Sequence, residues 1–157
     1  LLCPGAAQIY YGDETNRPLD IPGTEGDATL RSFMNWDELK ANRTRNGFST
    51  KDVLEHWQKL GRFRKAHPAV GAGTHTMLTE KPYVFRRNYS AVSGFSDAVV
   101  VGLDLPKGEK TVSVAGAFPD GTTLRDAYSG NKTTVANGKA TITSEFDLLL
   151  LERVPAR

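Results

Sequence analysis

Short hydrophobic runs alternate with turn residues over the second half of the chain. From about residue 69 onward, segments rich in Val, Ile, Thr, Tyr and Phe are separated by Pro-Lys-Gly, Pro-Asp-Gly, Ser-Gly-Asn and Asn-Gly clusters. This pattern predicts strands near 74–79, 83–89, 98–105, 110–115, 123–128, 133–135, 139–144 and 147–153. The Asn137-Gly138 pair predicts a two-residue hairpin turn, because both central residues of a type I′ turn have positive φ angles. Strands at this spacing are typical of an antiparallel sandwich.

One long segment, residues 50–66, has helical periodicity instead. Its apolar residues form one stripe, made of Val53, Leu54, Trp57, Leu60 and Gly61. Ser49 stands at the N-cap position, and Asp52 three residues later completes an arrangement like a capping box. Pro68 ends the helix. Basic residues gather in its last turn, where positive charges interact favourably with the negative end of the helix dipole. They are Arg62, Arg64, Lys65 and His67, and we expect them to form a solvated helix end.

The first 50 residues are rich in loop-forming residues. They begin with a β-prone cluster, residues 8–11, which lies between Pro4-Gly5 and Gly12-Asp13. From there to Arg31, Gly, Pro, Asp and Thr dominate without helical or strand periodicity. A loop this long is often functional, and the alternative of a partly disordered segment stays open.

The composition is that of a globular protein without a concentrated basic face. Of the 157 residues, 39% are hydrophobic and 24% are charged, and the formal net charge is +2. This charge argues against a protein that binds nucleic acid. No apolar run approaches a membrane span, and the longest, residues 148–151, fits a buried strand. The chain opens without an initiator Met, as if in the middle of a structure, so we expect a fragment and leave its compartment unknown.

Several segments resemble the α-amylase superfamily of glycoside hydrolases, and they follow the order found in that family. Residues 3–14, Cys-Pro-Gly-Ala-Ala-Gln-Ile-Tyr-Tyr-Gly-Asp-Glu, resemble the eighth strand of the family's (β/α)8 barrel, with Ala7 where proline is usual. Residues 31–37 resemble the Arg-x-x-Met-x-Trp stretch of the loop after that strand, and residues 60–69 resemble the eighth barrel helix. The small β-sandwich that closes these enzymes is similar to residues 124–130, 137–139 and 148–151.

The resemblance implies a mainly β protein. We expect an antiparallel, Greek-key-type β-sandwich, the α-amylase C-terminal domain, preceded by a strand, a long loop and a helix left from a (β/α)8 barrel. The expected domains are residues 1–68 for the barrel remnant and residues 69–157 for the sandwich.

The same resemblance implies an intact parent that cleaves α-glucosidic bonds of starch or maltooligosaccharides with retention. In the family, the nucleophilic aspartate, the acid glutamate and a supporting aspartate come from the fourth, fifth and seventh strands. All of these precede the eighth strand, so no catalytic residue is expected in this chain. Whether the chain by itself is an enzyme stays open.

Five residues are candidates for substrate contact in the parent enzyme. Ligands of such barrels bind on the loops that follow the strands. The candidates are Tyr11, Asp13, Glu14, Arg31 and Trp36. Structural alternatives stay open, because Tyr10 and Trp36 could belong to a core and Arg31 could pair with Asp13 or Glu14 to hold the loop.

No cofactor or metal is expected. The loop acids Asp13, Glu14, Asp20, Glu25 and Asp27 lack the alternation of an EF-hand loop, so calcium is possible in the parent but unsupported here. Solvated acids are the expected interpretation. The three histidines lack metal-ligand spacing. The single cysteine, Cys3, is expected to be a small buried apolar residue.

Two other functions stay open. The sandwich could be a carbohydrate-binding module in which exposed aromatic side chains form a platform, with Tyr83, Tyr89, Phe95 and Tyr128 as candidates. It could also be a structural or interaction domain without affinity for sugars. In the second case the apolar stripe of the helix would dock on the sandwich or mediate self-association.

Overall fold

A computed structural model describes residues 1–19 and 21–154. The chain is mostly β, with 33% strand and 23% helix. It divides into two compact units, one made of Leu1–Ala6 and Leu60–Arg157 and the other of Ala7–Lys59. Each unit is described by itself. The expected domain boundary at residue 68 remains a prediction. The boundary between the compact units lies instead inside the long helix, between Lys59 and Leu60.

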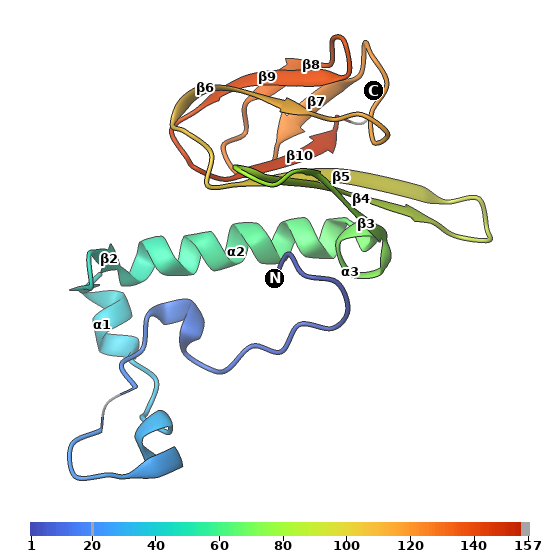
Figure 1. The fold of residues 1–157 in the computed structure, drawn as a ribbon. Helices are drawn as coiled ribbons and strands as arrows, with labels where there is room; N and C mark the ends of the chain where they lie inside the picture. The colour runs from blue at the N-terminus through green and yellow to red at the C-terminus, as the bar shows by residue number, and fades with distance from the viewer. Residues whose placement is uncertain (20, 155–157) are drawn as a thin grey trace. The chain divides into compact units, whose positions relative to one another are not determined.

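The larger unit is an antiparallel β-sandwich (Figure 1). Its main sheet has the order β3-β4-β5-β10-β7-β8, and β6 pairs with β9 in a second sheet. The strands are β3 (Thr74–Thr79), β4 (Tyr83–Ser90), β5 (Ser96–Leu103), β6 (Gly108–Ser113), β7 (Thr123–Asp126), β8 (Lys132–Thr134), β9 (Lys139–Ser144) and β10 (Leu149–Arg153). β10 lies between β5 and β7, so the two central pairings join strands that are not consecutive in the chain, as expected for a Greek-key-type sandwich.

The main sheet buries both of its faces. Val100 of β5 faces the second sheet, in a core shared with Val112, Ile142 and Leu149. Val99 and Val101 of β5 and Leu150 of β10 belong to a second core on the opposite face. Successive side chains of a strand point to opposite faces, so a strand covered on both sides is apolar at every position. This explains why residues 148–151 form a continuous Leu run, as the sequence predicted.

Two helices supply the covering of the second face. The helix α2 (Thr50–Ala66) contributes Phe63, and α3 (Pro68–Ala72) contributes Ala69 and Val70. The predicted helix is confirmed at both ends, and its last turns dock on the sheet. The short α3 was not predicted. Pro68 ends α2 but also begins α3, because proline fits the first position of a helix, where its missing amide hydrogen is not needed.

The first residues of the chain pack on this unit. The amide of Gly5 donates to the carbonyl of Gly71 at 2.8 Å, and the Arg64 guanidinium donates to the carbonyls of Leu1 and Cys3. Arg64 was expected to be solvated, and the structure corrects this. Cys3 was expected to be buried and is exposed, because only its backbone is held.

The smaller unit consists of short elements joined by loops. These are the 3-10 helices η1 (Asp13–Thr15) and η2 (Gly26–Leu30), the helix α1 (Trp36–Lys40), the strand pair β1 (Thr44–Arg45) and β2 (Phe48–Ser49), and the first turns of α2. The strand expected at residues 8–11 is not formed. A strand needs a neighbour for its backbone hydrogen bonds, and none of the described strands pairs with this segment.

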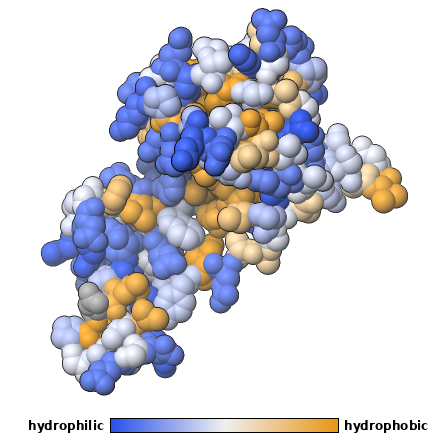
Figure 2. Space-filling model, viewed as in Figure 1, coloured by the Kyte–Doolittle hydropathy of each residue, from blue (hydrophilic) through white to orange (hydrophobic). Residues whose placement is uncertain are grey.

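Apolar side chains are exposed between the polar ones of the smaller unit (Figure 2). Phe33 is 98% exposed and Trp36 is 64% exposed. Exposure of this kind in several large side chains is typical of a surface that contacts other protein or a ligand. Self-association through the helix stripe stays a prediction.

Candidate functional site

A tight turn carries two of the candidate residues, Asp13 and Glu14. Gly12 has a φ of 89° and Asn16 a φ of 54°, and the 3-10 turn between them carries Asp13 and Glu14. The amide of Arg17 closes the turn by donating to the Gly12 carbonyl at 3.0 Å. Glu14 Oε2 accepts from the Gly12 amide at 3.0 Å, so this carboxylate stabilises the turn.

The two tyrosines before the turn fasten it to a distant segment. The Tyr10 hydroxyl donates to the Leu30 carbonyl at 3.3 Å, and the Tyr11 hydroxyl donates to the Ser32 carbonyl at 3.1 Å. These bonds hold both sides of Arg31. The two segments are about 20 residues apart in the sequence, and neither spacing nor composition indicated that they would meet.

A hollow of about 400 Å³ lies between these segments. It is lined by Tyr10, Asp13, Leu19, Asp27, Leu30 and Arg31. The structure therefore brings together Asp13 and Arg31 among the five candidates. The opposite charges of Asp13, Asp27 and Arg31 surround an apolar wall, which is the arrangement expected for a polar ligand with an apolar face.

The other three candidates do not line this hollow. Tyr11 and Glu14 make the hydrogen bonds to Ser32 and Gly12 described above. Trp36 begins α1 and is largely exposed. Asp27 is a lining residue that the sequence marked only as a solvated loop acid.

A hydrogen-bonded network supports the turn from below. The Thr15 hydroxyl and the Asn35 amide oxygen are 2.7 Å apart, and the Asn35 amide donates to Glu38 at 3.2 Å. Arg45 donates to Glu38 at 2.8 Å. Desolvation by burial raises the pKa of Glu38, but the hydrogen bonds from Asn35 and Arg45 and the nearby positive charges outweigh it and lower the pKa below 4.5. This carboxylate is therefore charged and structural.

No group of three or more His, Cys, Asp or Glu side chains that could hold a metal ion occurs among the described residues. Asp20, one of the loop acids considered from the sequence, lies outside the described residues. The calcium site considered for the parent enzyme therefore gains no support from the part of the chain described here.

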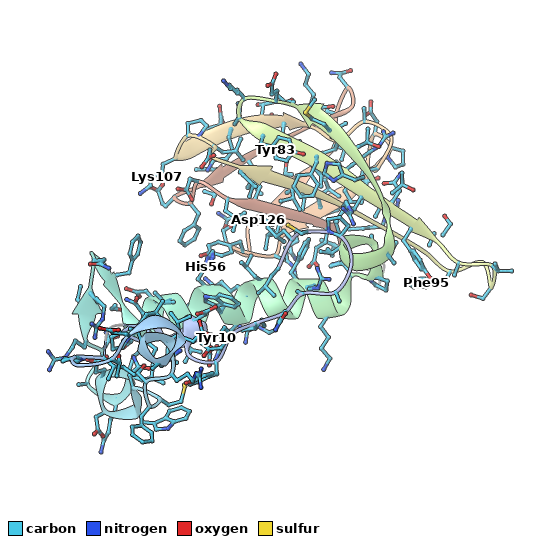
Figure 3. All side chains as sticks on the ribbon, turned by 60° about the horizontal axis from the view of Figure 1, so that its bottom comes forward. Tyr10, His56, Tyr83, Phe95, Lys107 and Asp126 are labelled. Carbon is cyan, nitrogen blue, oxygen red and sulfur yellow. The ribbon has the colours of Figure 1, made fainter. Side chains whose placement is uncertain are left out.

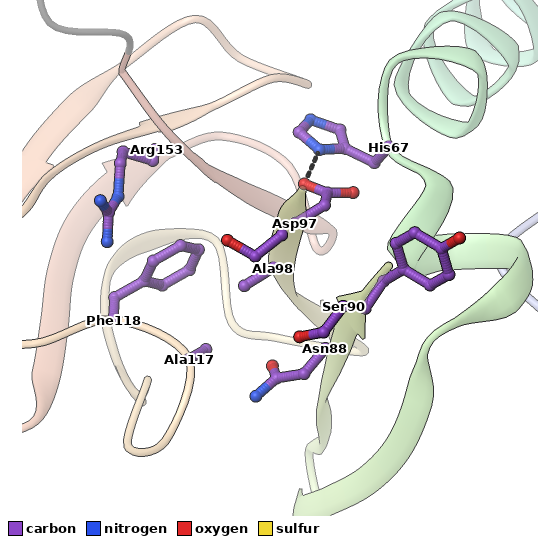
Figure 4. Close-up of a pocket in the computed structure, with 10 residues that line it drawn as sticks. His67, Asn88, Ser90, Asp97, Ala98, Ala117, Phe118 and Arg153 are labelled. Atoms are coloured by element: carbon purple, nitrogen blue, oxygen red, sulfur yellow. Dashed lines mark hydrogen bonds and ion pairs between the residues drawn. The ribbon is translucent and has the colours of Figure 1, made fainter. Parts of the chain in front are cut away.

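A second hollow, of about 360 Å³, lies on the sandwich (Figure 4). His67 and Asp97 meet at its rim, with Nδ1 2.9 Å from Oδ1. The other ring nitrogen of His67, Nε2, is 2.7 Å from Glu152 Oε2, and Glu152 also accepts from Arg125 Nε at 2.7 Å. His67 was expected at a solvated helix end. The structure corrects this, because strands β5 and β10 present carboxylates that the helix pattern gave no sign of.

The pKa values of this cluster follow from its contacts. Desolvation by burial lowers the pKa of His67, but the hydrogen bonds and charges of Glu152 and Asp97 together outweigh it and raise the pKa above 6.5. Burial likewise raises the pKa of Glu152, yet the bonds from His67 and Arg125 hold it below 4.5. The cluster is an ionic connection between the helix end and two strands.

The four aromatic residues considered for a sugar platform do not share one surface. Tyr83 and Phe95 lie at opposite ends of the β4–β5 hairpin (Figure 3). Tyr83, Tyr89 and Tyr128 pack against the core beneath the helices. The rings of Tyr89 and Phe95 are inclined by 55°. A flat strip of exposed rings is therefore not formed by these four residues.

Comparison with known proteins identifies the relatives of the chain. It is 43% identical over 90 residues, 57% of its length, to the periplasmic α-amylase of Escherichia coli (strain K12). It is 36% identical over 77 residues to a cyclomaltodextrinase from a Bacillus species. These matches fit a fragment of an α-amylase family enzyme. No family model matches it.

Solved structures of α-amylase family proteins share the fold. Amy13B of Eubacterium rectale matches 99% of this chain with a TM-score of 0.60 and 21% identity, and 33% of Amy13B is covered. AmyP, solved in complex with maltose, matches 91% of the chain with a TM-score of 0.60 and 22% identity, and 30% of AmyP is covered. These likenesses support the expected C-terminal sandwich of α-amylases.

The chain spans a small part of its α-amylase relatives. The matched regions cover 12% of the periplasmic α-amylase and 11% of the cyclomaltodextrinase. This partial coverage is consistent with a C-terminal segment of a glycoside hydrolase. Among the described residues, no helix is long and apolar enough to cross a membrane.

Proposed function

We propose that this chain is the non-catalytic carboxy-terminal segment of an enzyme that hydrolyses α-glucans such as starch or maltooligosaccharides. The observation that carries the proposal is the 43% identity to a periplasmic α-amylase over 90 residues. Retaining glycosidases need two carboxyl groups about 5 Å apart across the scissile bond. In this proposal the rest of the enzyme supplies both.

The sandwich and the smaller unit, Ala7–Lys59, which we call the loop unit, have different roles in this proposal. The sandwich stabilises the enzyme, since its cores and the His67 cluster fix the helix end on the main sheet. The loop unit continues a barrel, and the segment 8–11 becomes a strand when a neighbouring barrel strand supplies its hydrogen bonds. The exposed Phe33 and other apolar side chains of this unit are then covered by the barrel.

The loop unit also contributes to substrate binding. Asp13 and Arg31 line the hollow and hydrogen-bond sugar hydroxyls, and the exposed ring of Trp36 stacks on the apolar face of a sugar. Tyr11 and Glu14 act on substrate through the shape of the loop. AmyP, a protein of the same fold, was solved in complex with maltose, and maltose belongs to the class of sugars proposed here as ligands.

Release of reducing ends from soluble starch tests the division of roles. The complete protein that carries this chain is expected to hydrolyse starch, and the 157-residue chain alone is expected to be inactive. Turnover by the purified chain would contradict the proposal, as would inactivity of the complete protein on starch, pullulan and maltooligosaccharides. Maltotriose binding by the chain without turnover that is unchanged in Arg31→Gln would favour the carbohydrate-binding module instead.

An Arg31→Gln variant of the complete protein tests the site. We expect KM for maltooligosaccharides to rise about tenfold, because a hydrogen bond to a bound hydroxyl is lost. Arg43→Gln is the matched control, because Arg43 is 66% exposed in the same unit and does not line the hollow. Equal KM values in the two variants would remove Arg31 from the site.

A further inference from the structure

Among the described residues of the loop unit, Arg17 is the most completely buried charged residue. The residue is 5% exposed, and its guanidinium carbon lies 4.2 Å from the centre of the Tyr11 ring and 5.5 Å from that of Tyr10. None of the described carboxylates forms an ion pair with it. A buried charge is costly unless it is hydrogen-bonded, so the use of its donors determines what this residue does.

The donors of Arg17 bind the backbone on both sides of Arg31. Nη2 donates to the Leu30 carbonyl at 3.1 Å, and Nη1 donates to the Ser32 carbonyl at 3.2 Å and also to the Ser32 hydroxyl. Nε donates to the Tyr11 carbonyl at 3.1 Å. One planar group thus joins the segment before Asp13 to both neighbours of Arg31.

The tyrosine hydroxyls reinforce the same two acceptors. The Leu30 carbonyl accepts from Tyr10 as well as Arg17, and the Ser32 carbonyl accepts from Tyr11 as well as Arg17. A lysine cannot replace this arrangement, because its ammonium group lacks the fixed fork of a guanidinium. The separation of the two segments therefore depends on the shape of Arg17.

Gly12 leaves the space that Arg17 needs. A Cβ atom at Gly12 would lie 2.2 Å from Arg17 Nε and 2.5 Å from its Cδ, and Gly12 has a positive φ of 89°. Both the backbone conformation and the close approach require glycine. Tyr10, Tyr11 and Gly12 therefore act together with Arg17, five residues after Gly12, to hold the two segments.

We propose that Arg17 is a positioning residue that sets the distance between Asp13 and Arg31 across the hollow. This inference rests on the proposed function of the hollow as a sugar-binding site. Asp13 lies two residues from the carbonyl bound by Nε, and Arg31 lies between the carbonyls bound by the other two nitrogens. Arg17 does not line the hollow itself, so it acts on substrate through these two side chains.

Kinetics of Arg17→Gln and Arg17→Lys in the complete protein test this role. We expect KM for maltooligosaccharides to rise about tenfold in Arg17→Gln and by a smaller factor in Arg17→Lys, with kcat per active enzyme within about twofold. Arg43→Gln should leave both constants unchanged. If the variants lower only the fraction of active enzyme and leave KM unchanged, Arg17 stabilises the unit without positioning the site, and the proposal is wrong.

Hydrogen exchange on the 157-residue chain separates this inference from the proposed function. In Arg17→Gln, faster exchange is expected at the amides of Asp13 and Arg31, which bond to Tyr10 and Ala28, but not in α2. This change together with an inactive wild-type protein would disprove the hydrolase assignment and keep the geometric role. Unchanged exchange would overturn the role of Arg17.

Should Arg17→Gln fail to fold, Tyr11→Phe provides a milder variant. It removes the 3.1 Å bond to the Ser32 carbonyl and keeps the ring beside the guanidinium. The same exchange pattern and a smaller rise in KM are expected. An unchanged KM in a folded Tyr11→Phe protein would contradict the proposal that these hydrogen bonds to the Leu30 and Ser32 carbonyls determine the geometry of the hollow.

Discussion

The imidazole Nε2 of His67 lies 2.7 Å from Oε2 of Glu152, a residue 85 positions away in the chain. On its other nitrogen His67 meets Asp97, and Asp97 also accepts from the amide of Ala69 at 2.9 Å. The residue between α2 and α3 is thus bound to the two central strands β5 and β10. Because both contacts are strongest with a charged imidazole, the attachment depends on pH.

Stability of the sandwich should fall as pH rises from mildly acidic to alkaline values. The pKa of His67 is raised above 6.5, so its contribution is complete below 6.5 and is lost as pH rises through the folded-state pKa. The pKa of Glu152 is lowered below 4.5, so its contribution is complete above 4.5 and is lost as pH falls through the folded-state value. Both contribute fully between these two pH values.

Urea unfolding of the wild type and His67→Gln at pH 5.5 and pH 8.5 measures this effect. The variant should lose about 1.5–3 kcal/mol at pH 5.5, the scale of hydrogen bonds to charged groups, and clearly less at pH 8.5. An equal loss at both values would show that protonation of His67 does not contribute.

His75 offers a control of opposite sign. Burial, and then the charge of Arg87, lower the pKa of His75 below 6.5. The unfolded chain therefore binds more protons at this position, and the stability contributed there rises with pH up to about the ordinary value. His75→Gln should make the decline of stability with pH steeper, whereas His67→Gln should make it shallower. Slopes that change in the same direction would contradict this assignment.

Phe63 should be the main apolar anchor of α2 on the sheet. It is 3% exposed in the core shared with Phe85, Val99 and Leu150. Phe63→Ala should cost about 3–5 kcal/mol of unfolding free energy, because it leaves a cavity in this core; the better helix propensity of alanine offsets only a small part of the loss. The exposed neighbour Arg62, changed to Ala, should stay within about 0.5 kcal/mol. Comparable losses in the two variants would mean that the helix is not docked through Phe63.

Two glycine-to-alanine changes should have opposite signs. Gly138 has a φ of 67° in the Asn137-Gly138 turn, and a Cβ there would meet nothing nearer than Ala115 at 3.9 Å. Gly138→Ala should therefore cost about 1–2 kcal/mol from backbone strain alone. Gly61 lies inside α2 with open space around its Cβ position. Gly61→Ala should stabilise the protein by about 0.5–1 kcal/mol. Thermal unfolding of both variants checks the two signs.

The local structure of the sandwich was predictable because local rules determine it. Asn137, with a φ of 53°, and Gly138 form the expected turn. The strands β3 and β9 have the predicted bounds, because alternation and turn residues specify them. Ends of other strands differ by a few residues, since β-propensity does not determine where pairing stops.

The long-range contacts could not be predicted in the same way. Arg17 occurs in a run of turn residues, and nothing in the sequence indicates that its donors reach Leu30 and Ser32. His67 has the helical context of a solvated end, and its partners Asp97 and Glu152 are set by the sheet order. The segment 8–11 fails as a strand for the complementary reason, because propensity without a partner strand leaves backbone groups unpaired.

The beginning of α2 provides a last, local test. Ser49 Oγ lies 2.6 Å from Asp52 Oδ2 and accepts from the Asp52 amide at 3.2 Å, so the predicted cap is formed. Ser49→Ala should cost about 1 kcal/mol, because an amide of the first turn loses its acceptor. Glu55→Ala, which removes the surface pair with Lys59, should cost only about 0.3–0.5 kcal/mol. Hydrogen exchange should be faster at the Asp52 amide in Ser49→Ala and unchanged there in Glu55→Ala. If Ser49→Ala leaves that amide protected, the side chain of Ser49 does not cap the helix, and the first turn is held instead by the bond from Thr50 to the Arg43 carbonyl.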